Sequence, residues 1–213
     1  MKLERILIGT TSPDKLREIL QILGGLPVSL LKPRDQGNLP RVEEDGLTFR
    51  DNACKKALTL ARHFRMSVMA EDSGLEVDCL GGRPGVHSRR YSGPEGTDAE
   101  NNLKLLAELE GTPIDQRTAR YRCVVALATP AEVLTIADGV CEGRITEYPV
   151  GTGGFGYDPL FFYPPFGKTF GQVDLRLKNQ VSHRAKALRL FRERLFDLLK
   201  VPTPDLSARQ ENP

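Results

Sequence analysis

The segment between Val68 and Gly93 restricts the possible folds most strongly. It begins with the apolar run Val68-Met69-Ala70, which the acid pair Glu71-Asp72 follows directly. An apolar run that stops at two carboxylates is typical of a buried strand that carries acidic side chains to the edge of a sheet. The segment goes on with three glycines and a proline around Arg83, so its backbone can turn tightly and approach a ligand. We therefore predict a metal–phosphate site here, with a polar loop that starts at an N-capping Asp as the alternative.

The chain has 213 residues, enough to bury the core of one domain or of two closely packed lobes. Its net charge of +2 gives no electrostatic footprint for nucleic acid, and its four cysteines lack the spacing of a zinc site or a disulfide scaffold. The N-terminus does not resemble a secretory signal, and no apolar run is long enough to cross a membrane. We expect one cytoplasmic domain over residues 1–200, with no nucleic-acid or membrane partner. The proline-containing tail at 201–213 is expected to be disordered.

The N-terminal residues predict a strand that runs into a helix. Arg5 to Gly9 is apolar after its first residue, and Ser12 and Pro13 suit the N-cap and the first position of a helix. A helix N-terminus after a strand presents unpaired N–H groups to anions, and a neighbouring lysine adds positive charge. An ordinary helix start is the alternative to a phosphate cradle. The candidate phosphate-binding residues are Thr10, Thr11, Ser12, Pro13, Asp14 and Lys15.

Other parts of the pattern predict further helices and a long hairpin. Thr48 with Asp51, and Thr97 with Glu100, have the spacing of a capping box at a helix start. Ser182 is expected to cap a final amphipathic helix. Strands are expected at 28–31 and 160–163, and a long β-hairpin is expected from 119–128 and 133–140, continuing toward residue 145.

A second unusual segment, Gly151 to Pro159, places four glycines around two aromatic residues and an acid. Glycines beside an aromatic ring allow a flat ligand to approach the backbone and stack. A glycine-rich turn with core aromatics is the alternative. Further along, Lys178, His183 and Arg184 gather hydrogen-bond donors near the start of the final helix, although a lone histidine is often structural.

Taken in order, these motifs resemble the inosine triphosphate pyrophosphatases, also called the non-canonical purine nucleoside triphosphate pyrophosphatases. The resemblance covers nearly the whole chain except the tail, and five motifs in the right order make chance a poor explanation. The motifs are Thr10 to Lys15, Glu43 to Ala53, Asp72 to Gly93, Gly153 to Pro159, and Lys178 with Ser182-His183-Arg184.

The resemblance implies a mixed α+β fold, in which two lobes surround a central elongated mixed sheet with flanking helices and the active site lies in the cleft between them. It implies a homodimer that uses Mg²⁺ to hydrolyse inosine, deoxyinosine and xanthosine triphosphates to the monophosphate and pyrophosphate. Such an enzyme cleanses the nucleotide pool. A non-catalytic nucleotide sensor and a pyrophosphatase for modified pyrimidine triphosphates are the alternatives.

The resemblance also implies roles for individual residues. Asp72 corresponds to the catalytic carboxylate and a metal ligand, Glu43 to a second metal ligand, and Glu71 to a possible third. Ser73 and the segment from Thr10 to Lys15 would contact the substrate. Beyond the resemblance, the positive charges of Lys15 and Lys56 are expected to stabilise the leaving pyrophosphate. Two departures from the family pattern are Ser12, where Asn is usual, and Glu71, where Asp is common. The residues that would hold the base are Phe155, Gly156, Tyr157, Asp158, Lys178, His183 and Arg184.

The chemistry of the base agrees with these roles. A 6-keto group accepts hydrogen bonds, whereas the 6-amino group of adenine donates them. Donors from Lys178, His183 and Arg184 would therefore favour hypoxanthine or xanthine, and would face a donor in adenine. Mg²⁺ usually takes only one or two protein carboxylates beside phosphate oxygens and water, which Glu43 and Asp72 would supply.

Overall fold

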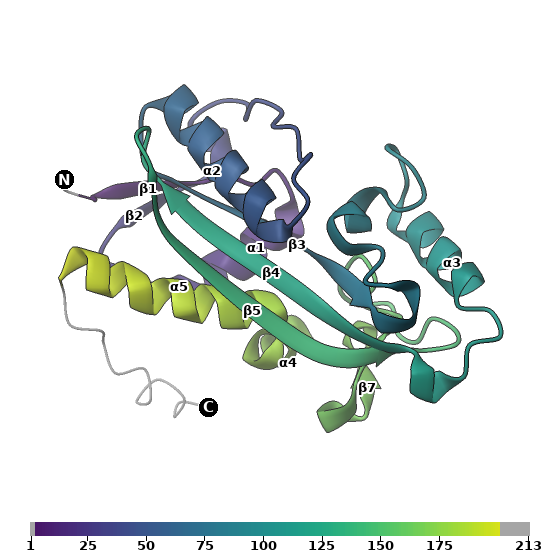
Figure 1. The fold of residues 1–213 in the computed structure, drawn as a ribbon. Coiled ribbons are helices and arrows are strands. Elements are labelled where there is room, and N and C mark those ends of the chain that lie inside the picture. The colour runs from purple at the N-terminus through teal and green to yellow at the C-terminus, as the bar shows by residue number, and fades with distance from the viewer. Residues whose placement is uncertain (1–2, 201–213) are drawn as a thin grey trace, which may run out of the picture.

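A computed structural model of the chain describes residues 3–200 and has a mixed α+β fold built on a sheet of seven strands (Figure 1). The strand order is β2-β1-β3-β4-β5-β6-β7. Strand β1 is parallel to β2 and β3, whereas the neighbours from β3 to β7 are antiparallel. A mixed sheet with flanking helices is the expected fold class, which is confirmed.

The boundaries of the elements follow the sequence pattern closely. The strands are β1 (Arg5–Ile8), β2 (Ser29–Leu31), β3 (Val68–Val77), β4 (Thr118–Ala128), β5 (Val133–Ile145), β6 (Phe161–Tyr163) and β7 (Lys168–Thr169). The α-helices are α1 (Pro13–Ile22), α2 (Phe49–Phe64), α3 (Asp98–Glu108), α4 (Leu175–Val181) and α5 (His183–Leu199). The predicted hairpin is confirmed as β4 and β5, the longest strands of the sheet.

Side-chain caps fix the helix starts, as predicted. The hydroxyl of Thr48 accepts a hydrogen bond from the Asp51 backbone N–H at the start of α2, and Thr97 does the same at the start of α3. Ser12 caps α1 and Ser182 caps α5 in the same way. Each cap pairs a backbone donor that the helix cannot satisfy by itself, so these residues set where the helices begin.

Strand β3 corrects one expectation. The apolar run was predicted to end at Glu71 and Asp72, but β3 continues unbroken to Val77, paired with β4 over its whole length. The acid pair therefore lies in the middle of a strand and not at the edge of the sheet. Successive side chains of a strand point to opposite faces, so the two neighbouring acids face different sides of the sheet.

Each face of the sheet carries its own core. Met69 packs with α1 and α5 on one face, whereas Val68 and Ala70 pack with α2 on the other. A third cluster lies around Leu75, Tyr121 and α3, toward the end of the molecule away from β1 and β2 (Figure 1). The long strands β3, β4 and β5 thus join two lobes, and the acid pair lies where the lobes meet.

Gly74 permits the close approach of the short 3-10 helix Gly85–Arg90 to β3. A Cβ atom at Gly74 would lie 2.3 Å from the Ser88 hydroxyl oxygen and 2.7 Å from the Gly85 carbonyl oxygen. We expect Gly74→Ala to lower the free energy of unfolding by about 1–3 kcal/mol, as overpacking of a tight core does. Urea unfolding measures this change. Gly24→Ala is the matched control, because its Cβ would approach no atom closer than 3.4 Å; equal stability of the two variants would contradict the prediction.

The prediction of a disordered tail at 201–213 concerns residues outside those that the structure describes. Within residues 3–200, no helix has both the length and the hydrophobicity that a bilayer-spanning helix needs.

Candidate active site

The two acids of β3 have different surroundings. Glu71 faces α1 and α5, and its carboxylate contacts Lys15 Nζ at 2.9 Å and Arg184 Nε at 2.7 Å. The Cys123 thiol also donates to it. Burial by itself would raise the pKa of Glu71, but Arg184 and Lys15 outweigh burial and hold this pKa well below its usual value. Glu71 is therefore an ionised structural carboxylate whose oxygens are already in contact with cations.

Asp72 faces α2 and forms no such ion pair with any residue that the structure describes. Its carboxylate accepts hydrogen bonds from Asn52 Nδ2 at 3.0 Å and from the Ser73 backbone N–H at 2.9 Å. Burial raises the pKa of Asp72, and the positive charge of Lys15 offsets this only in part. A buried carboxylate with a raised pKa is suited to accept a proton during a reaction.

A chain of alternating charges runs from Glu71 into the second lobe. Arg184 donates to Glu71 and also, from Nη1, to Glu18 at 2.5 Å. Glu18 lies 3.2 Å from Lys178 Nζ, which in turn donates to Asp158 at 2.6 Å. All five side chains are almost completely buried. Each charge in this chain is held in position by its neighbours, because a buried side chain that moved away would leave the next charge unpaired, which is energetically costly.

The predicted phosphate cradle lies at the N-terminus of α1. The Ser12 backbone N–H donates to the Thr10 hydroxyl at 3.2 Å, while Thr11 and Pro13 are exposed. Asp14, half-buried, is 3.4 Å from Arg17 in an ion pair. Burial would lower the pKa of Lys15, but Glu71 outweighs it and the pKa is raised, so the ammonium stays charged. The structure thus brings Lys15 into contact with Glu71 at one end of the chain of charges, where its positive charge also acts on Asp72.

The loop before α2 supplies further charge near Asp72. Lys56 forms an ion pair with Glu44 and donates to the Glu71 carbonyl oxygen. The negative charge of Glu44 contributes to the raised pKa of Asp72, after burial and Lys15. Glu43, the predicted metal ligand, is exposed. The structure therefore places Glu44 in the electrostatic surroundings of Asp72, while Glu43 stays a predicted ligand.

A magnesium ion is compatible with this arrangement only if the substrate completes its coordination. Among residues 3–200, no three His, Cys, Asp or Glu side chains converge as a ready-made metal cluster. Asp72 and Glu44 are acids that repel each other, and a cation near both would relieve that repulsion. Mg²⁺ commonly binds through one or two carboxylates together with phosphate oxygens and water. The donor set therefore fits Mg²⁺ held jointly with a triphosphate.

The predicted base-binding residues divide into two groups. The Phe155 ring lies 4.5 Å from Lys178 Nζ and 5.6 Å from the Arg184 guanidinium carbon. Ser73 is joined to this group, because its hydroxyl accepts from Arg184 Nη2 at 2.9 Å. A half-buried aromatic ring beside two cations is a suitable platform for a flat, electron-rich base.

The second group serves mainly to hold the glycine-rich loop. Tyr157 is buried, and its hydroxyl donates to the Ser88 carbonyl oxygen. The Gly156 backbone N–H donates to Asp98, and Asp158 accepts from the Phe155 N–H as well as from Lys178. The side chains of Tyr157 and Asp158 therefore shape the loop from within.

His183 lies between these groups. Its ring stacks on Tyr121 at 4.6 Å between centroids, and its Nδ1 atom has no hydrogen-bond partner among residues 3–200. Burial lowers the pKa of His183 well below the usual value, and the positive charge of Arg184 adds to this effect. The imidazole is therefore neutral and can donate from one nitrogen only.

A small cavity joins the two lobes beside Phe155. It has a volume of about 90 Å³, roughly three times the ~30 Å³ that a water molecule occupies in the liquid. Helix α1, the glycine-rich loop and α4 meet at this cavity. Its lining residues are Asp14, Arg17, Glu18, Gly154, Phe155, Val173, Leu175 and Lys178.

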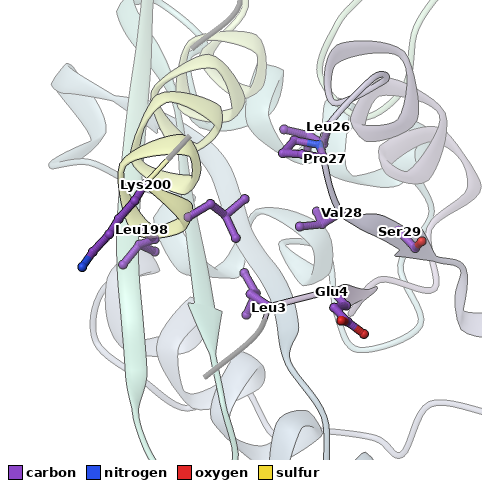
Figure 2. Close-up of a pocket in the computed structure, with 9 residues that line it drawn as sticks. Leu3, Glu4, Leu26, Pro27, Val28, Ser29, Leu198 and Lys200 are labelled. Carbon is purple, nitrogen blue, oxygen red and sulfur yellow. The ribbon is translucent and has the colours of Figure 1, made fainter. Parts of the chain in front are cut away.

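A larger cavity, of about 790 Å³, lies between the C-terminal end of α5 and the strands β1 and β2 (Figure 2). Its lining includes the apolar residues Leu3, Val28 and Leu198. None of the predicted site residues lines this cavity. It lacks the convergent charges that a triphosphate needs, so the site around Asp72 remains the candidate for chemistry.

Glu18 and Glu44 were not assigned a role by the sequence reasoning. Glu18 follows Lys15 by three residues, so both side chains lie on one face of α1, and this spacing was the available signal. For Glu44, its position beside Lys56 depends on how the loop folds onto α2, and the sequence offers no signal that separates it from Glu43.

Comparisons with known proteins give a consistent result. The sequence profile of the Ham1 family matches residues 6–194. The dITP/XTP pyrophosphatase of Geobacter sulfurreducens is 49% identical over 191 residues, which are 90% of this chain and 96% of that protein. The dITP/XTP pyrophosphatase of Geobacillus kaustophilus is 46% identical over 186 residues, 87% and 91% of the two chains. The solved structure of the Staphylococcus aureus Ham1 protein superposes with a TM-score of 0.82 at 34% identity, covering 92% of this chain and 100% of that one.

Proposed function

The chain belongs to the Ham1 family, and on this premise we propose that it hydrolyses non-canonical purine nucleoside triphosphates, namely inosine, deoxyinosine and xanthosine triphosphates, to the monophosphate and pyrophosphate. The observation that carries the proposal is one continuous series of contacts that joins the charged side chains to the aromatic ring of Phe155. Lys15, in the first turn of α1, contacts Glu71, the neighbour of Asp72 on β3, and the buried charges from Glu71 to Asp158 lead from there to the aromatic platform of Phe155. A triphosphate and a base would thus be held at opposite ends of one rigid array.

At the phosphate end, Lys15, Lys56 and the backbone N–H groups that start α1 would neutralise the charge that develops on the leaving pyrophosphate. Asp72 would accept the proton of the water that attacks the α-phosphorus. Its raised pKa favours this step, because the carboxylate is a stronger base than an exposed one. Asn52 holds Oδ2 of Asp72 in place and the Ser73 backbone N–H holds Oδ1, and each carboxylate oxygen keeps a second lone pair that can accept from the water.

We propose that Mg²⁺ is held by Asp72 and by an acid of the loop before α2. The candidates are the expected Glu43, which is exposed, and Glu44, which acts on the pKa of Asp72 but also pairs with Lys56. When bound, the ion supplies charge for the triphosphate and lowers the pKa of the attacking water. Glu71 is not available for this purpose, since Lys15 and Arg184 occupy its carboxylate.

The test is a substrate panel with purified protein. Inosine, deoxyinosine and xanthosine triphosphates should give a kcat/KM at least about 10²-fold above that of adenosine triphosphate, because buried donors that meet the adenine amino group are left unpaired. Removal of Mg²⁺ by a chelator, followed by its return, should abolish and restore activity. Equal rates for inosine and adenosine triphosphates would contradict the base-reading part. A preference for a modified pyrimidine triphosphate would contradict the proposal and favour a pyrophosphatase for modified pyrimidine nucleotides.

A cytoplasmic homodimer is a further proposal, supported by the resemblance of the motifs alone. A molar mass of 23.6 kDa in solution, that of one chain, would contradict the dimer.

A further inference from the structure

Glu18 has a feature that the reaction described above does not use. It lies on α1 with 1% of its surface exposed, and its oxygen Oε2 accepts from Arg184 Nη1 at 2.5 Å. The other oxygen, Oε1, lies 3.2 Å from Lys178 Nζ without the geometry of a hydrogen bond, and it accepts no hydrogen bond from any described residue. A buried carboxylate oxygen without a donor costs free energy, so this atom is incompletely satisfied in the free protein.

The charge state of Glu18 makes Oε1 an acceptor and not a donor. Burial would raise the pKa of Glu18, but Arg184 and Lys178 outweigh burial and lower it, so the group is ionised. An ionised carboxylate can only accept. Beside it, the ammonium of Lys178 can only donate. The structure therefore places one acceptor and one donor side by side, 3.2 Å apart.

Both groups line the small cavity of about 90 Å³ that Phe155 also lines. Oε1 is shielded from bulk solvent, so a donor reaches it from within the cavity, where a ligand beside the aromatic ring would supply one. Phe155 is next to glycines on both sides, and Gly154 and Gly156 have φ of +74° and +62°. The ring is therefore carried by a backbone segment that can adjust when a base stacks on it.

The 6-keto purines have the complementary edge. In hypoxanthine and xanthine, the O6 atom accepts and the neighbouring N1–H donates. In adenine the same two positions are reversed, because the 6-amino group donates and N1 accepts. A Lys–Glu pair therefore matches the lactam edge at both positions and opposes adenine at both.

We propose that Glu18 is a specificity-determining residue, whose Oε1 accepts the N1–H of a 6-keto purine while Lys178 donates to O6. The inference rests on the proposed function. It assigns to the site a negatively charged acceptor in addition to the cationic donors that the sequence indicated. Guanine shares the same lactam edge, so the pair selects 6-keto purines as a class.

A thermodynamic cycle tests the proposal. It combines one protein variant, Glu18→Gln, with one modified substrate and compares the two effects. In Glu18→Gln, the single amide oxygen will keep the shorter contact with Arg184, and the NH₂ group will take the place of Oε1. The NH₂ group cannot accept the N1–H. The cycle compares inosine triphosphate with 1-methylinosine triphosphate, which retains O6 but has no N1–H. The bulk of the methyl group affects both proteins alike and cancels in the cycle.

We expect Glu18→Gln to lower kcat/KM for inosine triphosphate by about 10- to 100-fold, the loss of one hydrogen bond to a charged group, and to change the value for the 1-methyl substrate less than about threefold. An equal loss for both substrates would overturn the proposal, since Glu18 would then act only by holding Arg184 and Lys178. No loss for either substrate would overturn it too. Arg17→Gln is the matched control, because Arg17 lines the same cavity but is exposed, and it should affect both substrates equally.

Binding of the product gives a readout that does not depend on turnover. Calorimetry with inosine and 1-methylinosine monophosphates on the wild type and on Glu18→Gln should show the same pattern in Kd. If the wild type hydrolyses no inosine triphosphate, the proposed function fails, but the binding cycle still decides the role of Glu18. An equal Kd for inosine monophosphate in the two proteins, or no binding to either, would refute it.

Discussion

Asp72→Asn is expected to lower kcat for inosine triphosphate by about 10²- to 10⁴-fold, the usual contribution of a general base. The amide has the shape of the carboxylate but cannot accept a proton from water. Nucleotide binding should persist, because Lys15, Lys56 and the Phe155 platform are unchanged. Steady-state kinetics at saturating Mg²⁺, together with Kd for inosine monophosphate, measure the two effects separately.

The fold should tolerate this change. Burial raises the pKa of Asp72, so the folded protein does not favour the negative charge at this position. The Gly46 N–H fixes the orientation of Asn52, so its NH₂ group still points toward residue 72. The new amide has one oxygen only, so the variant loses one of the two hydrogen bonds that Asp72 accepts from Asn52 and Ser73. We expect a loss of about 1 kcal/mol or less in the free energy of unfolding. Asp78→Asn, at the far end of β3, is the control with the same chemical change and should keep full activity. Turnover of Asp72→Asn within threefold of the wild type would exclude Asp72 as the base.

Arg184→Met should have the largest effect on stability. The side chain has 1% of its surface exposed and pairs with both Glu71 and Glu18. Its removal leaves two buried carboxylates with one cation each, and breaking a buried pair in this way costs about 3–5 kcal/mol. For a chain of this length, such a loss corresponds to a fall in Tm of about 6–20 °C. Thermal unfolding followed by circular dichroism measures it.

Arg189→Met is the matched control, because Arg189 lies on the same helix but is exposed and donates only to backbone oxygens. Its Tm should change by less than about 3 °C. Two variants with equal Tm would show that the buried chain of charges does not stabilise the fold. This result also bears on kinetics, since any test of Arg184 in base recognition must first separate lost specificity from lost stability.

The sequence predicted those parts of the fold that depend on local interactions. Ser12, Thr48, Thr97 and Ser182 cap helices because each supplies an acceptor to the first helical turn, and this requires no distant residue. The β4–β5 hairpin was predictable for a similar reason, because its strands are close in sequence.

The extent of β3 was not predicted correctly, and the reason is physical. Two adjacent acids seldom lie inside a buried strand, so the apolar run was expected to stop before them. In the structure, Lys15 and Arg184 come from two helices far apart in sequence and compensate the charge of Glu71. The alternation of side chains along a strand did hold the information that the two acids face different partners. Whether Glu71 or Asp72 pairs with Lys15 and Arg184 depends on how the helices pack on the sheet.

The sequence indicated which residues belong to the candidate site better than it indicated which of them contact one another. Lys15 and Arg184 do contact Glu71 on β3, and Lys178 and Arg184 lie beside Phe155. Tyr157 and Asp158, by contrast, hold the loop from within, and the exposed position of Glu43 compared with Glu44 depends on the path of one loop. No local pattern distinguishes these alternatives.

The central claim is that this chain breaks the bond between the α- and β-phosphates of a 6-keto purine triphosphate. Hydrolysis of inosine triphosphate in ¹⁸O-labelled water, analysed by mass spectrometry, tests it most directly. Attack on the α-phosphorus predicts unlabelled pyrophosphate and one ¹⁸O atom in inosine monophosphate. Inosine diphosphate with labelled inorganic phosphate would contradict the claim, because it would show that water attacks the γ-phosphorus.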